Sequence, residues 1–173
     1  KHGETVYDRS PLFYEEWGDE ASRMLLDLDE ELGQVFQSLN ENNDFDENNI
    51  EKIKIRFETE EPSVLSNKIR TAPGFQGIGS PIVACEGGYI PDLSSRYFIE
   101  DIEFGLCIIK SFAELCKIET PKLDEVIIWS QRLLNKEYLI GNQIKGKDSK
   151  ELLIPQNRGI NTKEQLIDFY KNL

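Results

Sequence analysis

The sequence predicts an all-α fold, a compact multi-helix bundle with a long central buried helix. The first observation is that apolar residues recur at the 3.6-residue helical period, most clearly over residues 19–40 and 120–135. The second is that residues 102–116 are apolar nearly all round, as expected of a helix in the core. The third is that residues typical of helix starts precede these segments. Six or more helices with short links form such a domain.

Composition sets limits on the kind of protein. At 173 residues, with 39% of them hydrophobic, the chain has the size of one domain and can bury a real core. Its net charge of −12 repels nucleic acid phosphates and anionic membrane surfaces, so we expect neither as a partner. No apolar run approaches the roughly 20 residues of a membrane span, and we find no signal peptide. We therefore expect a soluble, cytoplasmic protein.

The chain has three cysteines, Cys85, Cys107 and Cys116, which is an odd number without a Cys-x-x-Cys pair. Two of them lie within the apolar helical pattern of residues 102–116. This arrangement indicates reduced thiols in a cytosolic protein rather than disulfides or a zinc site.

The first part of the chain predicts two helices. Ser10-Pro11 is typical of a helix start and predicts a brief helix over Leu12-Phe13-Tyr14, which Gly18-Asp19 ends. A long amphipathic helix follows over residues 19–40. Its acidic members are most simply its solvated face; these are Asp27, Asp29, Glu30 and Glu31.

Residues 41–49 form a loop by composition. Asp44-x-Asp46-x-Asn48 is similar to the opening of a calcium loop, but Asn49 and Ile55 stand where the turn glycine and the closing glutamate belong. We therefore expect no metal site. Residues 50–57 alternate apolar and polar side chains, which locally favours a strand, but in a helical domain we predict a helix.

The middle of the chain predicts a short helix over residues 62–72 with Val64, Leu65 and Ile69 directed inward. The glycines of residues 73–81 stand in the wrong order for a dinucleotide-binding fingerprint and follow no strand. We predict an irregular loop that shapes a substrate cleft. Residues 82–85 favour an extended segment, ended by Gly87-Gly88.

The last third predicts two more helices. Thr120-Pro121 supplies a cap and a first-turn proline for a helix to about Asn135. Residues 141–150 predict a flexible, mostly basic loop. Thr162 to Gln165 form a capping box for the last helix, in which the expected buried residues are Leu166, Ile167, Phe169, Tyr170 and Leu173.

The stretch Ser94–Leu106 places a guanidinium, a phenol and three carboxylates at the start of the long helix, which we expect to reach about Lys117. One interpretation is structural: acidic residues favour the first turn of a helix, and Arg96 and Glu100 form an i,i+4 surface pair. The other is a polar site. By itself the pattern favours the structural interpretation, because ion-pair clusters are often only structural.

A resemblance favours the site. The runs Ser95–Leu106 and Glu119–Asp124 resemble the helical C-terminal domain of the octopine/nopaline (opine) dehydrogenase family. The family pattern is Arg-Tyr, two variable residues, Glu-Asp, then Gly-Leu, and after a helix Thr-Pro with Asp three further on. The likeness extends to His2, to Phe13-Tyr14 and to Leu28–Glu31. The implied fold is also similar to the helical domain of 6-phosphogluconate dehydrogenase-like enzymes.

The resemblance implies that residues 1–173 are a single helical domain, the C-terminal part of a longer enzyme. An N-terminal Rossmann domain of the same chain would bind NAD or NADP, so the isolated fragment would be inactive. The enzyme would be an oxidoreductase acting on CH-NH bonds that condenses a 2-oxo acid with the amino group of an amino acid and reduces the product. Whether the enzyme forms a homodimer stays open.

The resemblance also implies roles for residues. His2 and Asp101 would be catalytic, with the carboxylate orienting the imidazole. Arg96, Tyr97 and Glu100 would bind substrate, and the guanidinium of Arg96 would hold the carboxylate of the oxo acid. Positions five apart point about 140° from each other on a regular helix, so Arg96 must stand at or before the first turn. Tyr97, Asp101, Phe104 and Ile108 would then share a face.

Two other functions stay open. Related two-domain dehydrogenases also use a helical second domain, so the chain could belong to a reductase of a 2-oxo or hydroxy acid that needs no amine. A non-catalytic helical module for dimerisation or interaction is the second alternative. Amine-dependent oxidation of NADH separates the two enzymes.

Overall fold

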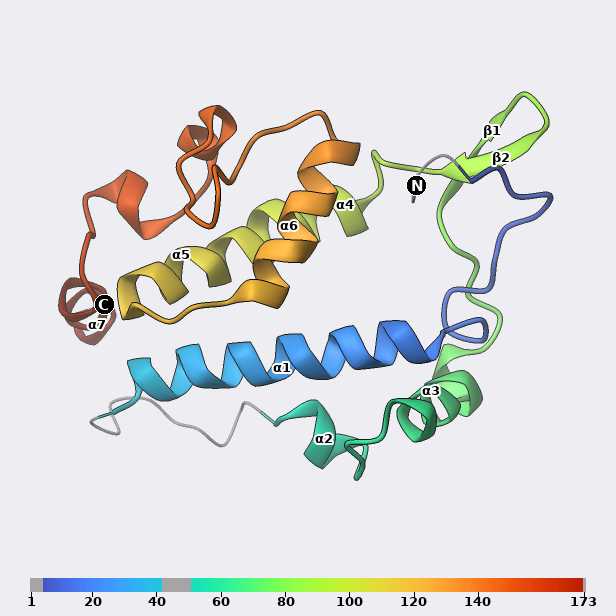
Figure 1. Ribbon diagram of the computed structural model, residues 1–173, viewed down its shortest axis with the longest axis horizontal. Coiled ribbons are helices and arrows are strands. Elements are labelled where there is room, and N and C mark those ends of the chain that lie inside the picture. Colours follow the sequence, from blue (N-terminus) through green and yellow to red (C-terminus); the bar gives the residue numbers. More distant parts are fainter. Residues whose placement is uncertain (1–4, 42–50, 173) are drawn as a thin grey trace. The chain divides into compact units, whose positions relative to one another are not determined.

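The computed structural model describes residues 5–41 and 51–172. They form two compact units, divided within the first helix (Figure 1). The first unit contains the described residues up to Asp27 and those from Glu51 to Ser95. The second contains those from Leu28 to Glu41 and from Arg96 to Asn172. In these ranges no helix has both the length and the apolar character of a membrane-spanning segment.

The first unit combines short helices with one β-hairpin. Its helices are the N-terminal part of α1 (Asp19–Leu39), α2 (Ile53–Arg56) and α3 (Pro62–Thr71), followed by a 3₁₀ turn over Pro73–Phe75. The strands β1 (Ile82–Cys85) and β2 (Gly88–Pro91) pair antiparallel, with Ile82 opposite Pro91. The hairpin closes at Gly87 and Gly88, which both have positive φ, a conformation that favours glycine.

Buried serines connect α1 and α3 inside the first unit. The hydroxyls of Ser22 and Ser66 are 2.8 Å apart, and both side chains are buried. The indole of Trp17 donates a 2.9 Å hydrogen bond to the Ser22 hydroxyl. Tyr14 stacks on Phe75 with ring centroids 4.3 Å apart. Short polar side chains therefore complete the small core that Leu65 and Ile69 form.

The structure confirms the helix predicted over residues 50–57, which is α2, and corrects three other expectations for this unit. Leu12-Phe13-Tyr14 is not a helix, because Leu12 pairs with Gly79 and a turn follows it. Val64 is exposed on α3 while Leu65 and Ile69 are buried. The strand β2 was not predicted. Of the loop predicted over residues 41–49, all but Glu41 lies outside the described residues, including Asp44 to Asn49 of the rejected calcium site.

The second unit is built around one long helical rod. It begins with α4 (Arg96–Asp101), continues through a π-helical turn over Ile102–Leu106 and ends with α5 (Cys107–Cys116). Figure 1 shows α6 (Pro121–Leu133) crossing this rod. Two 3₁₀ turns, Lys147–Glu151 and Pro155–Arg158, lead to α7 (Lys163–Lys171). The C-terminal part of α1 belongs to the same unit.

The core of the second unit lies between the rod, α6 and the segment that follows α6. The residues that form this core are Ile102, Cys107, Leu123, Ile127, Tyr138, Leu139, Ile144, Leu152 and Ile154. The amide oxygen of Gln131 accepts hydrogen bonds from the backbone N–H groups of Tyr138 and Leu139. The segment predicted as a flexible loop therefore contributes buried side chains and a 3₁₀ turn.

Glu31 corrects the prediction of a solvated acidic face on α1. Its side chain is only 8% exposed, and its two carboxylate oxygens accept the backbone N–H groups of Lys122 at 2.8 Å and Leu123 at 2.9 Å. These N–H groups belong to the first turn of α6, where backbone N–H groups have no hydrogen-bond acceptor within the helix. Thr120 was predicted to cap α6, but it makes no side-chain cap hydrogen bond. Glu31 provides the cap.

The last helix is only partly as predicted. The hydroxyl of Thr162 accepts the backbone N–H of Gln165, which confirms the predicted cap, while the Gln165 side chain accepts the N–H of Asn161 instead of that of Thr162. Leu166 and Ile167 are buried, but Phe169 and Tyr170 are each 50% exposed, and Leu173 lies outside the described residues. A helix at the edge of a unit buries a narrower stripe than a central one. The mostly helical architecture and the three free cysteines agree with the sequence.

Candidate functional site

Arg96 is the first residue of α4, as the five-residue spacing to Asp101 required. Before it, the Asp92 carboxylate accepts the backbone N–H of Ser94 at 2.9 Å and its hydroxyl at 2.6 Å, which forms a tight turn. Aspartate in this position is typical of turns. This turn ends the extended segment and lets the helix begin at Arg96.

The structure brings Arg96 and Glu100 together. The Nε of Arg96 lies 3.8 Å from a carboxylate oxygen of Glu100, and the two side chains are 71% and 60% exposed. A pair this exposed contributes little to stability, typically about 0–1 kcal/mol. Asp101 is also exposed, whereas Tyr97 is half-buried. The accessible guanidinium and carboxylates suit ligand binding better than they suit holding the fold.

The predicted catalytic pair can be placed only in part. Asp101 is the last residue of α4, immediately before the π-helical turn. His2 lies outside the described residues. Their pairing therefore stays a prediction.

A π-helical turn over Ile102–Leu106 follows Asp101, and in it the backbone N–H of Cys107 donates to the carbonyl of Ile102. Hydrogen bonds that span five residues instead of four displace the following residues by about one position on the helix surface. The face predicted for Tyr97, Asp101, Phe104 and Ile108 assumes a regular α-helix, and the π-helical turn interrupts that regularity. Phe104 is 51% exposed. Such turns are rare in proteins, and those that occur often lie at functional sites.

Glu103, the second residue of the π-helical turn, accepts a 2.6 Å hydrogen bond from the phenol of Tyr138. Tyr138 is fully buried in the core. Burial and, after it, the hydrogen bond to Glu103 raise the pKa of Tyr138, so the phenol stays protonated and donates. Burial, and to a lesser extent the charge of Glu103, raises the pKa of the neighbouring Cys107 to about 12. The sequence drew attention to Glu103 but not to its partner 35 residues later.

A second polar cluster missed by the sequence lies where α5 meets α6. Nζ of Lys110 lies 2.7 Å from Oδ1 of Asp124 and 4.0 Å from Oε1 of Glu114. Lys110 also donates a 3.4 Å hydrogen bond to the hydroxyl of Thr120. Burial raises the pKa of Glu114. One lysine inside an apolar helical pattern gave no signal, since its nearest partner, Asp124, lies on another helix.

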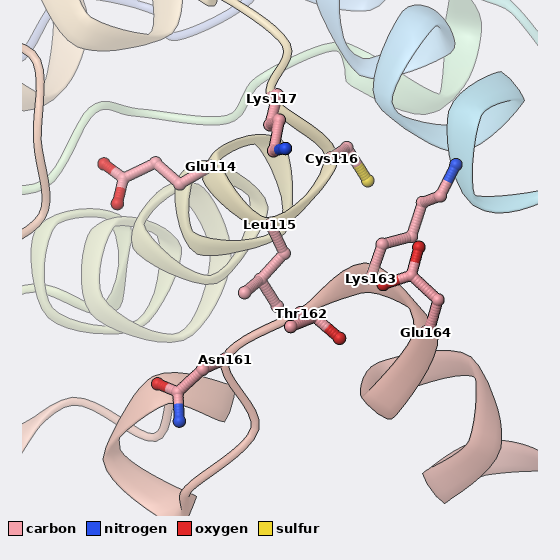
Figure 2. A pocket seen from close by; sticks show the side chains of 8 residues that line it. All are labelled: Glu114, Leu115, Cys116, Lys117, Asn161, Thr162, Lys163 and Glu164. Atoms are coloured by element: carbon pink, nitrogen blue, oxygen red, sulfur yellow. The ribbon is translucent and has the colours of Figure 1, made fainter.

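Figure 2 shows a surface pocket of about 340 Å³ between the end of α5 and the start of α7. It is lined by Glu114, Leu115, Cys116, Lys117, Asn161, Thr162, Lys163 and Glu164. The ammonium of Lys163 is already paired with Glu41 at 2.8 Å. Cys116 follows Arg96 by about 30 Å along the rod, at 1.5 Å per residue. The pocket is therefore separate from the Arg96 stretch.

The described residues offer little for a metal or a dinucleotide. In this part of the chain, no group of three or more His, Cys, Asp or Glu side chains could hold a metal ion. The glycine-rich residues 73–81 follow α3 rather than a strand and precede β1. A dinucleotide-binding fingerprint needs the opposite order, strand before glycines and helix after them. The glycine-rich loop therefore does not fit the phosphates of NAD.

Comparison with known proteins identifies the relatives of this chain. Residues 3–134 match the family model described as the NAD/NADP octopine/nopaline dehydrogenase, alpha-helical domain. A tauropine dehydrogenase of Arabella iricolor is 32% identical over 168 residues, which cover 92% of this chain and 42% of the relative. An opine dehydrogenase of Haliotis discus hannai is 38% identical over 101 residues, which cover 58% of this chain and 25% of the relative.

Solved structures give the same result. An octopine dehydrogenase solved with NADH and pyruvate superposes with a TM-score of 0.84 and 27% sequence identity, covering 95% of this chain and 41% of that chain. The same enzyme solved with NADH and L-arginine gives a TM-score of 0.84 and 26% identity. The chain thus spans less than half the length of the relatives that it matches.

Proposed function

Since the chain belongs to the octopine/nopaline dehydrogenase family, we propose that it supplies the helical substrate-binding and catalytic domain of an NAD(P)-dependent opine dehydrogenase. The observation that carries this proposal is the 32% identity with a tauropine dehydrogenase across 92% of the chain. In the proposed reaction, the amine of an amino acid adds to the keto carbon of a 2-oxo acid and water leaves. The resulting imine takes a hydride at carbon and a proton at nitrogen. The product is an N-(1-carboxyalkyl)amino acid.

Arg96 would hold the carboxylate of the oxo acid. Its guanidinium can form two parallel hydrogen bonds to a carboxylate, which fixes the orientation of the keto group. The 3.8 Å separation from Glu100 exceeds a normal hydrogen bond, and the side chain is largely exposed, so the fork is accessible. In this proposal Tyr97 and Glu100, on the same short helix, contact the substrates beside it.

His2 and Asp101 would form the acid–base pair. The carboxylate would hold the imidazole in one orientation and stabilise its protonated form. The imidazole would then move protons to and from the reacting oxygen and nitrogen while the imine forms. Histidine suits this task because its ordinary pKa lies near neutral pH, and the chain has only this one.

The cofactor would be bound mainly by an N-terminal Rossmann domain of the same chain. The glycine-rich residues 73–81 support this assignment because their order does not suit a dinucleotide. When bound, the nicotinamide supplies the hydride, and the helical domain supplies the groups that hold and protonate the substrates.

A single assay tests the proposal. An enzyme in which this chain follows its nucleotide-binding domain is given NADH or NADPH, a 2-oxo acid and a panel of amino acids. The proposal predicts cofactor oxidation that requires both substrates. Oxidation that continues without any amine would instead support a 2-oxo acid reductase. Activity that survives the combined change of Arg96 and Asp101 would support a structural role for this domain.

A further inference from the structure

The hydrogen bond between Tyr138 and Glu103 joins the core of the second unit to the turn that follows Asp101. Glu103 stands two positions after Asp101 in the π-helical turn, and its carboxylate accepts the phenol at 2.6 Å. A hydrogen bond from a neutral donor to a carboxylate is shorter and stronger than one between neutral groups. This contact therefore holds the π-helical turn in place through the side chain of Glu103.

Tyr138 is a fixed donor because its backbone is held on both sides. Its N–H donates to the Gln131 amide oxygen at 3.0 Å, and its carbonyl accepts the N–H of Gly146 at 2.9 Å. Gly146 is required here, since a Cβ atom at that position would lie 2.1 Å from the carbonyl oxygen of Glu137. The phenol itself is fully buried. Any adjustment of the contact must come from Glu103.

A π-helical turn is less favourable than a regular α-helical turn, and it persists where surrounding contacts determine it. Relaxation of this turn to α-helical geometry would shift Glu103 by about one position, roughly 100° around the axis, and would break its bond to Tyr138. The same shift would rotate α4, with Arg96 and Asp101, relative to α5. The contact thus links the register of the candidate site to a rigid part of the core.

We propose that Tyr138 is a positioning residue, which by holding Glu103 fixes the π-helical turn and so aims Asp101 and Arg96 at the substrates. This inference rests on the proposed function, because positioning has meaning only if Asp101 and Arg96 act on substrate. It adds two residues, Tyr138 and Glu103, that do not themselves touch the reacting atoms. A merely structural role would affect stability without affecting the acid–base behaviour of the site.

The test uses the full-length enzyme with Tyr138→Phe, Glu103→Ala and Glu103→Gln. Tyr138→Phe removes only the hydroxyl, and Glu103→Ala removes the acceptor, so each should lower kcat about 10-fold to 100-fold, the scale of a misplacement of about 1 Å. Glu103→Gln keeps an oxygen that accepts from the phenol and should retain kcat within about 3-fold. The Tyr138→Phe/Glu103→Ala double variant should lose no more than about the larger single loss, since the two residues act as one unit.

Ser130→Ala is the matched control. The Ser130 hydroxyl is buried in the same unit and donates to the carbonyl of Val126 at 2.8 Å, so its removal costs a buried hydrogen bond away from the turn. It should leave kcat unchanged. The pH profile of kcat/KM separates the two roles, because a loss of stability alone does not shift it. In Tyr138→Phe, its alkaline limb should shift to lower pH, in the same direction as in Asp101→Asn.

The outcomes separate the inference from the proposed function. If Asp101→Asn lowers kcat but Tyr138→Phe and Glu103→Ala change neither kcat nor the pH profile, the positioning role is wrong and the proposed site stands. If Asp101→Asn has no effect, the proposed site fails and the inference fails with it. Should Tyr138→Phe not fold, the comparison of Glu103→Ala with Glu103→Gln decides, since equal activity of these two variants contradicts the role.

Discussion

Lys110 and Asp124 form an ion pair in which Nζ lies 2.7 Å from Oδ1, although the Lys110 side chain is only 3% exposed. The contact is a close ionic one, without the alignment of a hydrogen bond to Oδ1. It joins α5 to α6. Charges in such a position are costly to bury and are more costly to leave unpaired.

We predict that breaking this pair destabilises the protein strongly. Asp124→Ala leaves the buried ammonium without its nearest counter-charge and should lower the free energy of unfolding by about 3–5 kcal/mol. Replacing both residues by apolar ones of similar volume, Lys110→Met with Asp124→Leu, should restore most of that loss. Urea denaturation of the single and double variants measures both effects. If the double variant is as unstable as Asp124→Ala, the ion pair stabilises the fold by more than the neutralisation of its two buried charges.

A second prediction concerns the cap that Glu31 provides for α6. Glu31→Ala removes two charge-assisted hydrogen bonds to first-turn N–H groups and should cost about 1–3 kcal/mol. Glu31→Gln keeps one acceptor oxygen and should cost less. The control is Glu125→Ala, which removes an exposed pair with Lys122 on the same helix and should change stability by under about 1 kcal/mol. Equal losses from the alanine variants at Glu31 and Glu125 would contradict the capping role.

Cys107 should be chemically silent in the folded protein. Because burial raises the pKa of its thiol to about 12, only roughly one molecule in 10⁴ carries the reactive thiolate at pH 8. We predict that mass spectrometry finds no iodoacetamide adduct on Cys107 in the native protein at pH 8 and finds one after denaturation. Raising the pH toward 12, as far as the protein stays folded, should increase the labelling of Cys107. Rapid native labelling at pH 8 would show that the core around Tyr138 opens.

The sequence predicts the helices better than it predicts their contacts. Periodicity and start signals located α1, α3, α6 and α7 because both depend on residues close together in the chain. The roles of Glu31, Lys110 and Tyr138 depend on partners 14 to 92 residues away, which no local pattern encodes. The π-helical turn escaped for the same reason, since an ordinary helical pattern continues through Ile102–Leu106.

For the candidate site, too, the sequence predicts the residues better than their contacts. The Arg96 stretch was found because the family resemblance assigns its residues by order and spacing. The structure adds that Arg96 begins α4 and that Asp101 ends it. It also adds the support from Tyr138, which lies outside the resembling runs.

A fourth prediction tests the role of Arg96. In the full-length enzyme, Arg96→Lys should raise the KM for the oxo acid by about 10-fold or more, because an ammonium replaces two parallel hydrogen bonds by a point charge. The KM for the amino acid should change little. Stability should also change little, since the pair with Glu100 is exposed. Steady-state kinetics with each substrate varied in turn gives both constants, and an unchanged KM for the oxo acid would make Arg96 structural.

The fifth prediction concerns the proposed acid–base pair of His2 and Asp101. If Asp101 orients His2, then removing either residue costs much of what removing both costs, because parts of one catalytic assembly are strongly non-additive. Each single loss should be about 10²–10⁴-fold, the range for a positioned acid–base group. In contrast, an exposed carboxylate without a catalytic role would, on change to Asn, cost under about 1 kcal/mol of stability and leave kcat almost unchanged.

The most direct measurement is kcat/KM against pH for His2→Ala, Asp101→Asn and the double variant of the full-length enzyme. We expect the double variant to be about as slow as the slower single variant, and the alkaline limb of Asp101→Asn to move to lower pH, because the carboxylate stabilises the protonated imidazole. Losses that multiply in the double variant, together with an unmoved alkaline limb, would contradict the pair.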